Sequence, residues 1–189
     1  MSATTCWPRS DAASAAGGDT VPTLLFLCTG NSCRSILAEA TFNHLAPPGW
    51  RAISAGSHPT GVVHPRALAL LGREGIDTHA CASTSWDRLE VVPDAVVTVC
   101  ADAAGETCPV YLAPVVRAHW GVDDPARVVG TDAEVDAAFA RAYTVLRARI
   151  EALLAMPLDA AASHRDALRE ALEQAGRIMR SADGPADAR

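Results

Sequence analysis

The stretch TLLFLCTGNSCRSILAEATFNHLA, residues 23–46, decides the fold of this 189-residue chain. It begins with the apolar run 23–27, a pattern typical of a parallel β-strand that is covered on both faces. A polar loop, 28–35, follows, and the next residues predict a helix that stops at Pro47. A strand, a tight loop and a helix in this order predict one unit of a parallel α/β sheet.

The rest of the chain repeats this alternation of strands and helices. Further strands are expected at 51–55, 95–99 and 117–122, and helices at 65–75, 85–89 and 133–154. Beyond Pro157, a tail helix is expected over about 160–181, with one apolar face that consists of Leu168, Leu172, Ala175 and Met179. Packing of this face against the domain is favoured over dimerisation. Ligands of such sheets bind at the carboxyl ends of the strands, so the loops after the first and third strands are the first candidates for a site.

Composition narrows the possible functions. The formal net charge of −6 argues against a nucleic-acid partner, and no apolar run approaches the roughly 20 residues of a membrane span. Residues 1–20 lack a continuous apolar segment, so we predict a disordered leader and a cytoplasmic protein. We expect the folded domain at 21–156 and a helical, partly disordered tail at 157–189. In a reducing compartment, the six cysteines point to catalysis or metal binding more than to cross-links.

The loop CTGNSCRS, residues 28–35, has the features of an oxyanion site. A compact loop that closes into a helix N-terminus turns successive backbone N–H groups toward one point, and the helix dipole adds to their field. Arg34 can bind two oxygens of a tetrahedral anion, and this environment favours Cys28 as a reactive thiolate to which Ser35 donates a hydrogen bond. Gly30 and Asn31 suit left-handed conformations. The predicted substrate-binding residues are Thr29, Gly30, Asn31, Ser32, Cys33 and Arg34.

The loop sequence also allows simpler interpretations than an oxyanion site. Cys28 could be a buried structural cysteine in a strand-to-helix turn, with Arg34 in a surface salt bridge. Cys33 could form a disulfide with Cys28, although a small residue that packs the loop is the favoured interpretation. The position of the Cys-x5-Arg pattern between a strand and a helix favours a functional site.

The sequence CTGNSCRS directly after the first strand resembles the active-site loop of the low-molecular-weight protein tyrosine phosphatases and of the arsenate reductases that share their fold. The resemblance runs from about Thr23 to Leu154 and includes the turn 54–56 and the Asp-Pro pair at 124–125. It implies a single α/β domain with a four-stranded parallel sheet flanked by helices, which agrees with the strand and helix pattern, plus the C-terminal helical extension.

Three features resemble the reductases rather than the phosphatases. Cys100 ends the third strand and Cys108 follows eight residues later, as in the redox pair of the thioredoxin-coupled reductases. The segment 119–126 resembles their acid loop. After the Asp-Pro pair come Ala126 and Arg127, where the phosphatases carry aromatic residues.

The resemblance implies that Cys28 attacks arsenate with Asp124 as general acid, Asp123 being the weaker candidate. Cys100 and Cys108 would then relay the resulting disulfide to thioredoxin or a glutathione-type thiol system, with no bound organic cofactor. A tyrosine or small-molecule phosphatase is the alternative, and an arsenic- or phosphoprotein-binding module is a third hypothesis. A zinc site built from Cys81, Cys100 and Cys108 lacks the usual ligand spacing, so no metal is expected.

Overall fold

The four predicted strands form a single parallel sheet in the order β2-β1-β3-β4. The computed structural model describes residues 21–100, 115–162 and 164–179. The strands are β1 (Thr23–Cys28), β2 (Arg51–Gly56), β3 (Ala95–Thr98) and β4 (Val116–His119). The central position of β1, between β2 and β3, brings the end of this strand beside the ends of its two neighbours.

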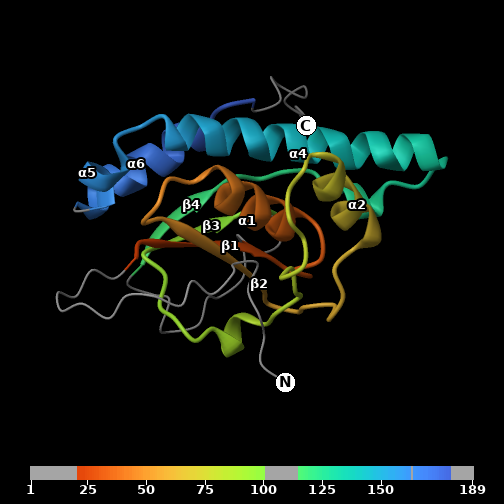
Figure 1. The fold of residues 1–189 in the computed structure, drawn as a ribbon, viewed down its shortest axis with the longest axis horizontal. Coiled ribbons are helices and arrows are strands. Elements are labelled where there is room, and N and C mark those ends of the chain that lie inside the picture. The colour runs from red at the N-terminus through yellow and green to blue at the C-terminus, as the bar shows by residue number, and fades with distance from the viewer. Residues whose placement is uncertain (1–20, 101–114, 163, 180–189) are drawn as a thin grey trace, which may run out of the picture.

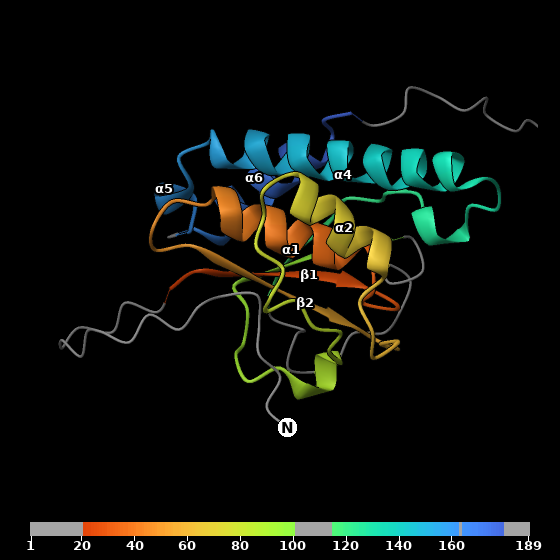
Figure 2. The same ribbon diagram turned by 45° about the vertical axis from the view of Figure 1, so that its right-hand side comes forward.

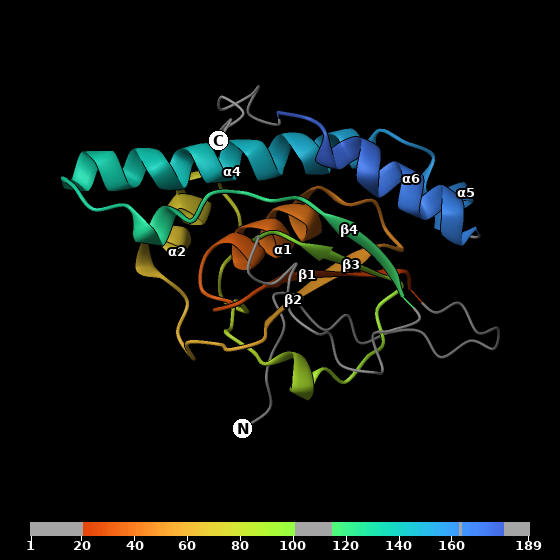
Figure 3. The same ribbon diagram turned by 180° about the vertical axis from the view of Figure 1, so that it is seen from behind.

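The α-helices gather on one face of the sheet, as Figures 1, 2 and 3 show. They are α1 (Arg34–Leu45), α2 (Pro65–Arg73), α4 (Asp132–Leu154), α5 (Leu158–Ala162) and α6 (Arg165–Gly176). Pro65 occupies the first turn of α2, and a capping box formed by Thr131 and Glu134 starts α4. The short 3₁₀-helix η1 (Trp86–Arg88) lies on the opposite side of the sheet and is capped by Ser85 as predicted.

Strand β1 divides the core into two layers. Leu24 and Phe26 face the large core beneath the helices, whereas Leu25 and Leu27 face a smaller cluster that includes Trp86. All six residues of the strand are buried, which confirms the expectation of a strand covered on both faces. This burial fixes the position of Cys28, the last residue of β1, at the edge of the sheet where the loop begins.

The C-terminal helical extension is present, but it differs from the single helix expected over 160–181. It consists of α5 and α6, and α6 ends at Gly176. Leu168, Leu172 and Ala175 are buried against the domain, whereas Met179 lies beyond the helix with a φ of 49° and is half exposed. The predicted face is therefore correct for three of its four residues, and it packs onto this chain itself. Strand β4 also stops earlier than predicted, because the chain turns after Trp120 toward the acid loop.

Candidate active site

Two polar groups of the loop surround the sulfur of Cys28. Its Sγ lies 3.0 Å from Ser35 Oγ and accepts a hydrogen bond from the backbone N–H of Asn31 at 3.1 Å. Ser35 is the second residue of α1, so the sulfur lies at the positive end of the helix dipole. The structure therefore brings together Cys28 and Ser35 as the sequence predicts.

The segment 58–64 holds the loop in a conformation that suits anion binding. Its backbone N–H groups at 58, 60 and 64 donate to the carbonyl oxygens of Thr29, Gly30 and Ser32, each at 2.9 Å. In a planar trans peptide the N–H points away from the C=O. Because three loop carbonyls point outward to this segment, the N–H groups of the residues that follow them point toward the inside of the loop.

Asn31 connects the loop to its surroundings through several hydrogen bonds. It has a φ of 42°, as predicted, and is fully buried. Its side-chain amide donates to Ser35 Oγ at 2.9 Å and to Ser54 Oγ at 2.8 Å, and its Oδ1 accepts from the backbone N–H of Thr84 at 2.6 Å. The same amide therefore orients the hydroxyl that faces Cys28. The prediction of a left-handed Gly30 is wrong, since that residue has an ordinary φ and one left-handed residue suffices for the turn.

Three further residues support the loop, and no role at the site was predicted for them from the sequence, although two of them lie in the segment 54–56 that the family resemblance includes. Ser54 and Glu39 are both buried, and Ser54 Oγ donates to Glu39 Oε2 at 2.6 Å. A Cβ atom on Gly56 would lie 2.5 Å from the carbonyl oxygen of Thr29, so the end of β2 can approach the loop only with glycine there. The available sequence signal for this support was a single glutamate within the mostly apolar stretch 36–42.

Arg34 and Asp124 form an ion pair at the rim of the loop. The Nη2 of Arg34 lies 2.7 Å from Asp124 Oδ2, and Nη1 donates to the carbonyl of Val122 at 3.1 Å. The Nε of Arg34 is buried and has no hydrogen-bond partner among the described residues. An unsatisfied buried donor on a guanidinium is the group that an oxyanion would complete. Asp123, the weaker candidate for the acid, is exposed.

Cys100 is a buried thiol beside the loop and is not in a disulfide. It is 1% exposed, and its Sγ lies 3.7 Å from Thr29 Oγ1. Residue 29 directly follows Cys28, and the parallel pairing of β1 with β3 explains this proximity. The second predicted relay thiol, Cys108, lies outside the described residues.

Cys33 is a buried free thiol at the start of α1, in agreement with its interpretation as a packing residue rather than a disulfide partner of Cys28. Burial raises the pKa of the Cys33 thiol to about 12.

We expect iodoacetamide to leave Cys33 unmodified in the folded protein at pH 8, because the thiolate is the reacting form and a raised pKa keeps the thiol protonated below about pH 12. Peptide mapping by mass spectrometry measures this directly. In urea at pH 9, where burial is lost, Cys33 should be alkylated readily. Equal labelling of Cys33 in the folded and unfolded protein would contradict the assignment.

These features define an α/β protein with a cysteine at the base of an oxyanion loop. The model of the family described as low molecular weight phosphotyrosine protein phosphatase matches residues 23–167, and the chain belongs to this family.

Similar proteins carry the name arsenate reductase. The arsenate reductase of Shouchella clausii (strain KSM-K16) is 39% identical over 130 residues, which are 68% of this chain and 91% of that protein. The arsenate reductase of Bacillus subtilis (strain 168) is 42% identical over 120 residues, 62% of this chain and 84% of that protein. The crystal structure of an arsenate reductase from Archaeoglobus fulgidus superposes with a TM-score of 0.59 at 27% identity, covering 70% of this chain and 99% of that one.

Proposed function

We propose that this chain is an enzyme that reduces arsenate to arsenite with Cys28 as nucleophile and Cys100 as the first relay thiol. The observation that supports it most directly is the thiol of Cys100 in contact with Thr29, beside the oxyanion loop. A hydrolytic phosphatase needs only one cysteine, whereas a two-electron reduction needs two sulfurs that can join in a disulfide. The names of the similar proteins point to the same reaction.

In the first step, arsenate binds inside the loop between the inward backbone N–H groups and Arg34. The free N–H at Arg34 Nε and the adjacent Nη2 offer two donors to its oxygens. Cys28 Sγ attacks arsenic and an oxygen leaves as water, with a proton supplied by Asp124. The ion pair at 2.7 Å keeps the Asp124 carboxyl next to any anion that Arg34 holds.

In the second step, the thiolate of Cys100 attacks Cys28 Sγ. The sulfur–arsenic bond breaks, its electron pair stays on arsenic, and arsenite leaves as a Cys28–Cys100 disulfide forms. Two thiolates have lost two electrons and As(V) has gained them, so the step balances. From the sequence, Cys108 then attacks Cys100 to release Cys28, and an external thiol reduces the Cys100–Cys108 disulfide.

Thioredoxin is the proposed electron donor, with a glutathione-type thiol system as the competing source. We propose a cytoplasmic location, because Cys28, Cys33 and Cys100 are thiols, the form that a reducing compartment favours. Cys81, in contrast to the expectation from the sequence, is disulfide-bonded. Within the described residues, none of the helices is long and apolar enough to cross a membrane. No bound organic cofactor is required for the chemistry above.

Phosphatase activity is the second candidate, since the loop cannot separate phosphate from arsenate by shape or charge. In that reaction Cys28 would form a phosphocysteine that water hydrolyses. Ala126 and Arg127 are exposed beside Asp124, so these two positions offer no aromatic surface for a phosphotyrosine ring. This observation favours a small anion over a phosphotyrosine protein as substrate.

The test is arsenite production by the purified protein with thioredoxin, thioredoxin reductase and NADPH. We expect arsenate-dependent NADPH oxidation with one arsenite formed per NADPH, and slower turnover with glutathione and glutaredoxin. Hydrolysis of para-nitrophenyl phosphate is measured in parallel. Phosphatase turnover without arsenate reduction by any thiol donor would decide for the second candidate.

A further inference from the structure

The C-terminal helix α6 lies largely beyond the part of the chain that the family shares. The family match ends at residue 167, whereas α6 runs to Gly176. The helix nevertheless contacts both β4 and α4, and Leu172 in its second half contacts Trp120, where the chain leaves β4 for the acid loop. Figure 3 shows α6 beside β4, the strand that leads into the acid loop. A helix in this position can influence the conformation of the acid loop.

Trp120 forms the contact between α6 and the acid loop. It is fully buried, and its indole N–H donates to the backbone carbonyl of Leu172 at 2.8 Å. The backbone of α6 packs directly on the ring, because a Cβ atom on Gly176 would lie only 2.6 Å from Trp120 Cδ1. Trp120 precedes Asp124 by four residues, so its position sets where the acid loop begins.

Arg149 of α4 forms hydrogen bonds with both the acid loop and the segment that follows α6. Its guanidinium is buried and donates from Nη1 to the carbonyls of Trp120 at 2.8 Å and Gly121 at 3.3 Å. Its Nε donates to the carbonyl of Ile178 at 3.0 Å, just beyond the end of α6. One side chain therefore joins Ile178, just after α6, to Trp120 and Gly121 near the start of the acid loop.

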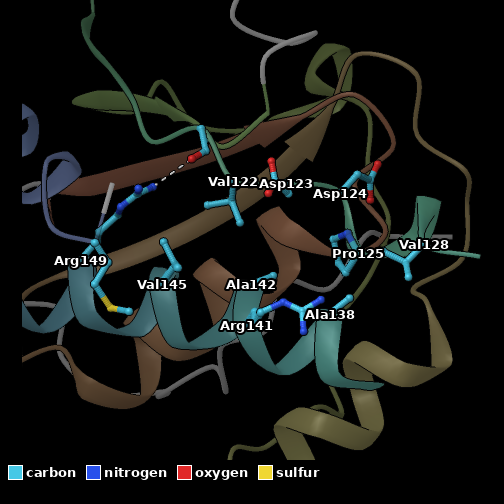
Figure 4. A pocket seen from close by; sticks show the side chains of 12 residues that line it. Val122, Asp123, Asp124, Pro125, Val128, Ala138, Arg141, Ala142, Val145 and Arg149 are labelled. Atoms are coloured by element: carbon cyan, nitrogen blue, oxygen red, sulfur yellow. Dashed lines mark hydrogen bonds between the residues drawn. The ribbon is translucent and has the colours of Figure 1, made fainter. Parts of the chain in front are cut away.

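Part of the acid loop faces a cavity, although Pro125 is buried and the 3₁₀-helix η3 (Pro125–Arg127) contacts α4. A cavity of about 430 Å³ separates it from α4, with Val122, Asp123 and Asp124 among the lining residues on one side and Ala138, Arg141, Ala142 and Val145 on the other (Figure 4). Because side chains do not fill this space, this part of the loop packs only incompletely against α4. Further support comes from the Trp120 end, from the Val122 N–H, which donates to the Val99 carbonyl at 3.1 Å, and from Arg34, which binds the Val122 carbonyl and Asp124.

We propose that α6, through its contacts with Trp120 and Arg149, positions the acid loop so that Asp124 can donate its proton. This inference rests on the proposed role of Asp124 as general acid. Trp120 and Arg149 are positioning residues and do not touch the substrate. Small displacements of a catalytic group reduce the rate constant of the chemical step more than they reduce substrate affinity. Substitutions of these positioning residues are therefore expected to lower kcat and to leave KM nearly unchanged.

The test is a double-mutant cycle with Trp120→Phe and Asp124→Asn in the full-length chain, measured on arsenate with thioredoxin. Trp120→Phe keeps an aromatic ring and removes the N–H that binds Leu172. We expect kcat to fall about five- to tenfold with KM for arsenate within about twofold, and Asp124→Asn to lower kcat about 10²-fold. In the Asp124→Asn background, Trp120→Phe should change kcat less than about twofold, because there is no acid left to position.

Gly176→Ala is the second variant, because its new Cβ pushes on the same ring from the helix side. Leu168→Ala is the matched control: Leu168 is buried on α6 near Val115 and Val116, at the other end of β4, so kcat should remain at the wild-type value. If the protein hydrolyses para-nitrophenyl phosphate but does not reduce arsenate, the same cycle is run on that substrate, which also needs an acid for its leaving group.

If Trp120→Phe lowered kcat by the same factor in the wild type and in the Asp124→Asn background, the proposal would be overturned, since equal factors indicate a general loss of structure. A fall in kcat for Leu168→Ala that matches the fall for Trp120→Phe would overturn it as well. A wild-type rate for Asp124→Asn would remove the acid role on which the inference rests. Loss of arsenate reduction with a preserved cycle on the aryl phosphate would instead refute only the proposed substrate.

Discussion

Cys28→Ser is expected to abolish arsenate reduction, lowering kcat by at least about 10⁴-fold, to the background of the assay. A serine hydroxyl cannot be oxidised to a disulfide, so the two electrons that arsenic takes up would have no source. The hydroxyl is also a weaker nucleophile at neutral pH than the sulfur that Ser35 and the Asn31 N–H surround. The measurement is arsenite formed per enzyme with thioredoxin as donor.

The control for Cys28→Ser is its ability to bind the anion. Arg34 and the inward loop N–H groups remain in this variant, so phosphate should still bind in calorimetry with a Kd within about threefold of the wild type. Thermal unfolding should be little changed, because serine replaces sulfur in a polar setting. Residual turnover above about 1% of wild type, by the estimate above, would mean that another thiol starts the reaction.

The parts of this protein that the sequence predicts well are those that depend on local pattern. Strand β1 is recognisable because its run Leu24–Leu27 is entirely apolar, and α1 because a helical composition follows the loop directly. The cysteine, the arginine and the serine of the loop lie within eight residues, so their convergence follows from the turn alone. Ser85 and Pro65 likewise mark helix starts through their own side chains.

The features that could not be predicted join residues far apart in the chain. The Arg34–Asp124 ion pair spans 90 positions, and the bond between Trp120 and Leu172 spans 52. Periodicity also extended the tail helix through Met179, since the spacing of apolar residues does not record where the backbone departs from the helix. The bond from Asn31 to Ser54 needs the β1–β2 register, which no local pattern supplies.

Cys100→Ser is expected to stop repeated turnover with thioredoxin while leaving the anion site intact. The hydroxyl that replaces the thiol cannot attack Cys28 Sγ, so the thiol–arsenic adduct has no internal partner and arsenite is not released. Without any external thiol, the wild-type protein should form one equivalent of arsenite and lose two titratable thiols. Cys100→Ser should form far less than one equivalent under the same conditions.

Two comparisons separate this relay role from simple damage to a buried position. Iodoacetamide labelling of Cys28, and its protection by phosphate, should be the same in Cys100→Ser as in the wild type, because the loop contacts of Cys28 are formed by Ser35 and Asn31. Cys108→Ser should give the first equivalent of arsenite and then stop, with a Cys28–Cys100 disulfide visible by mass spectrometry. A Cys100→Ser protein that turns over normally would show that Cys100 only packs the end of β3, and that a different thiol accepts the oxidation of Cys28.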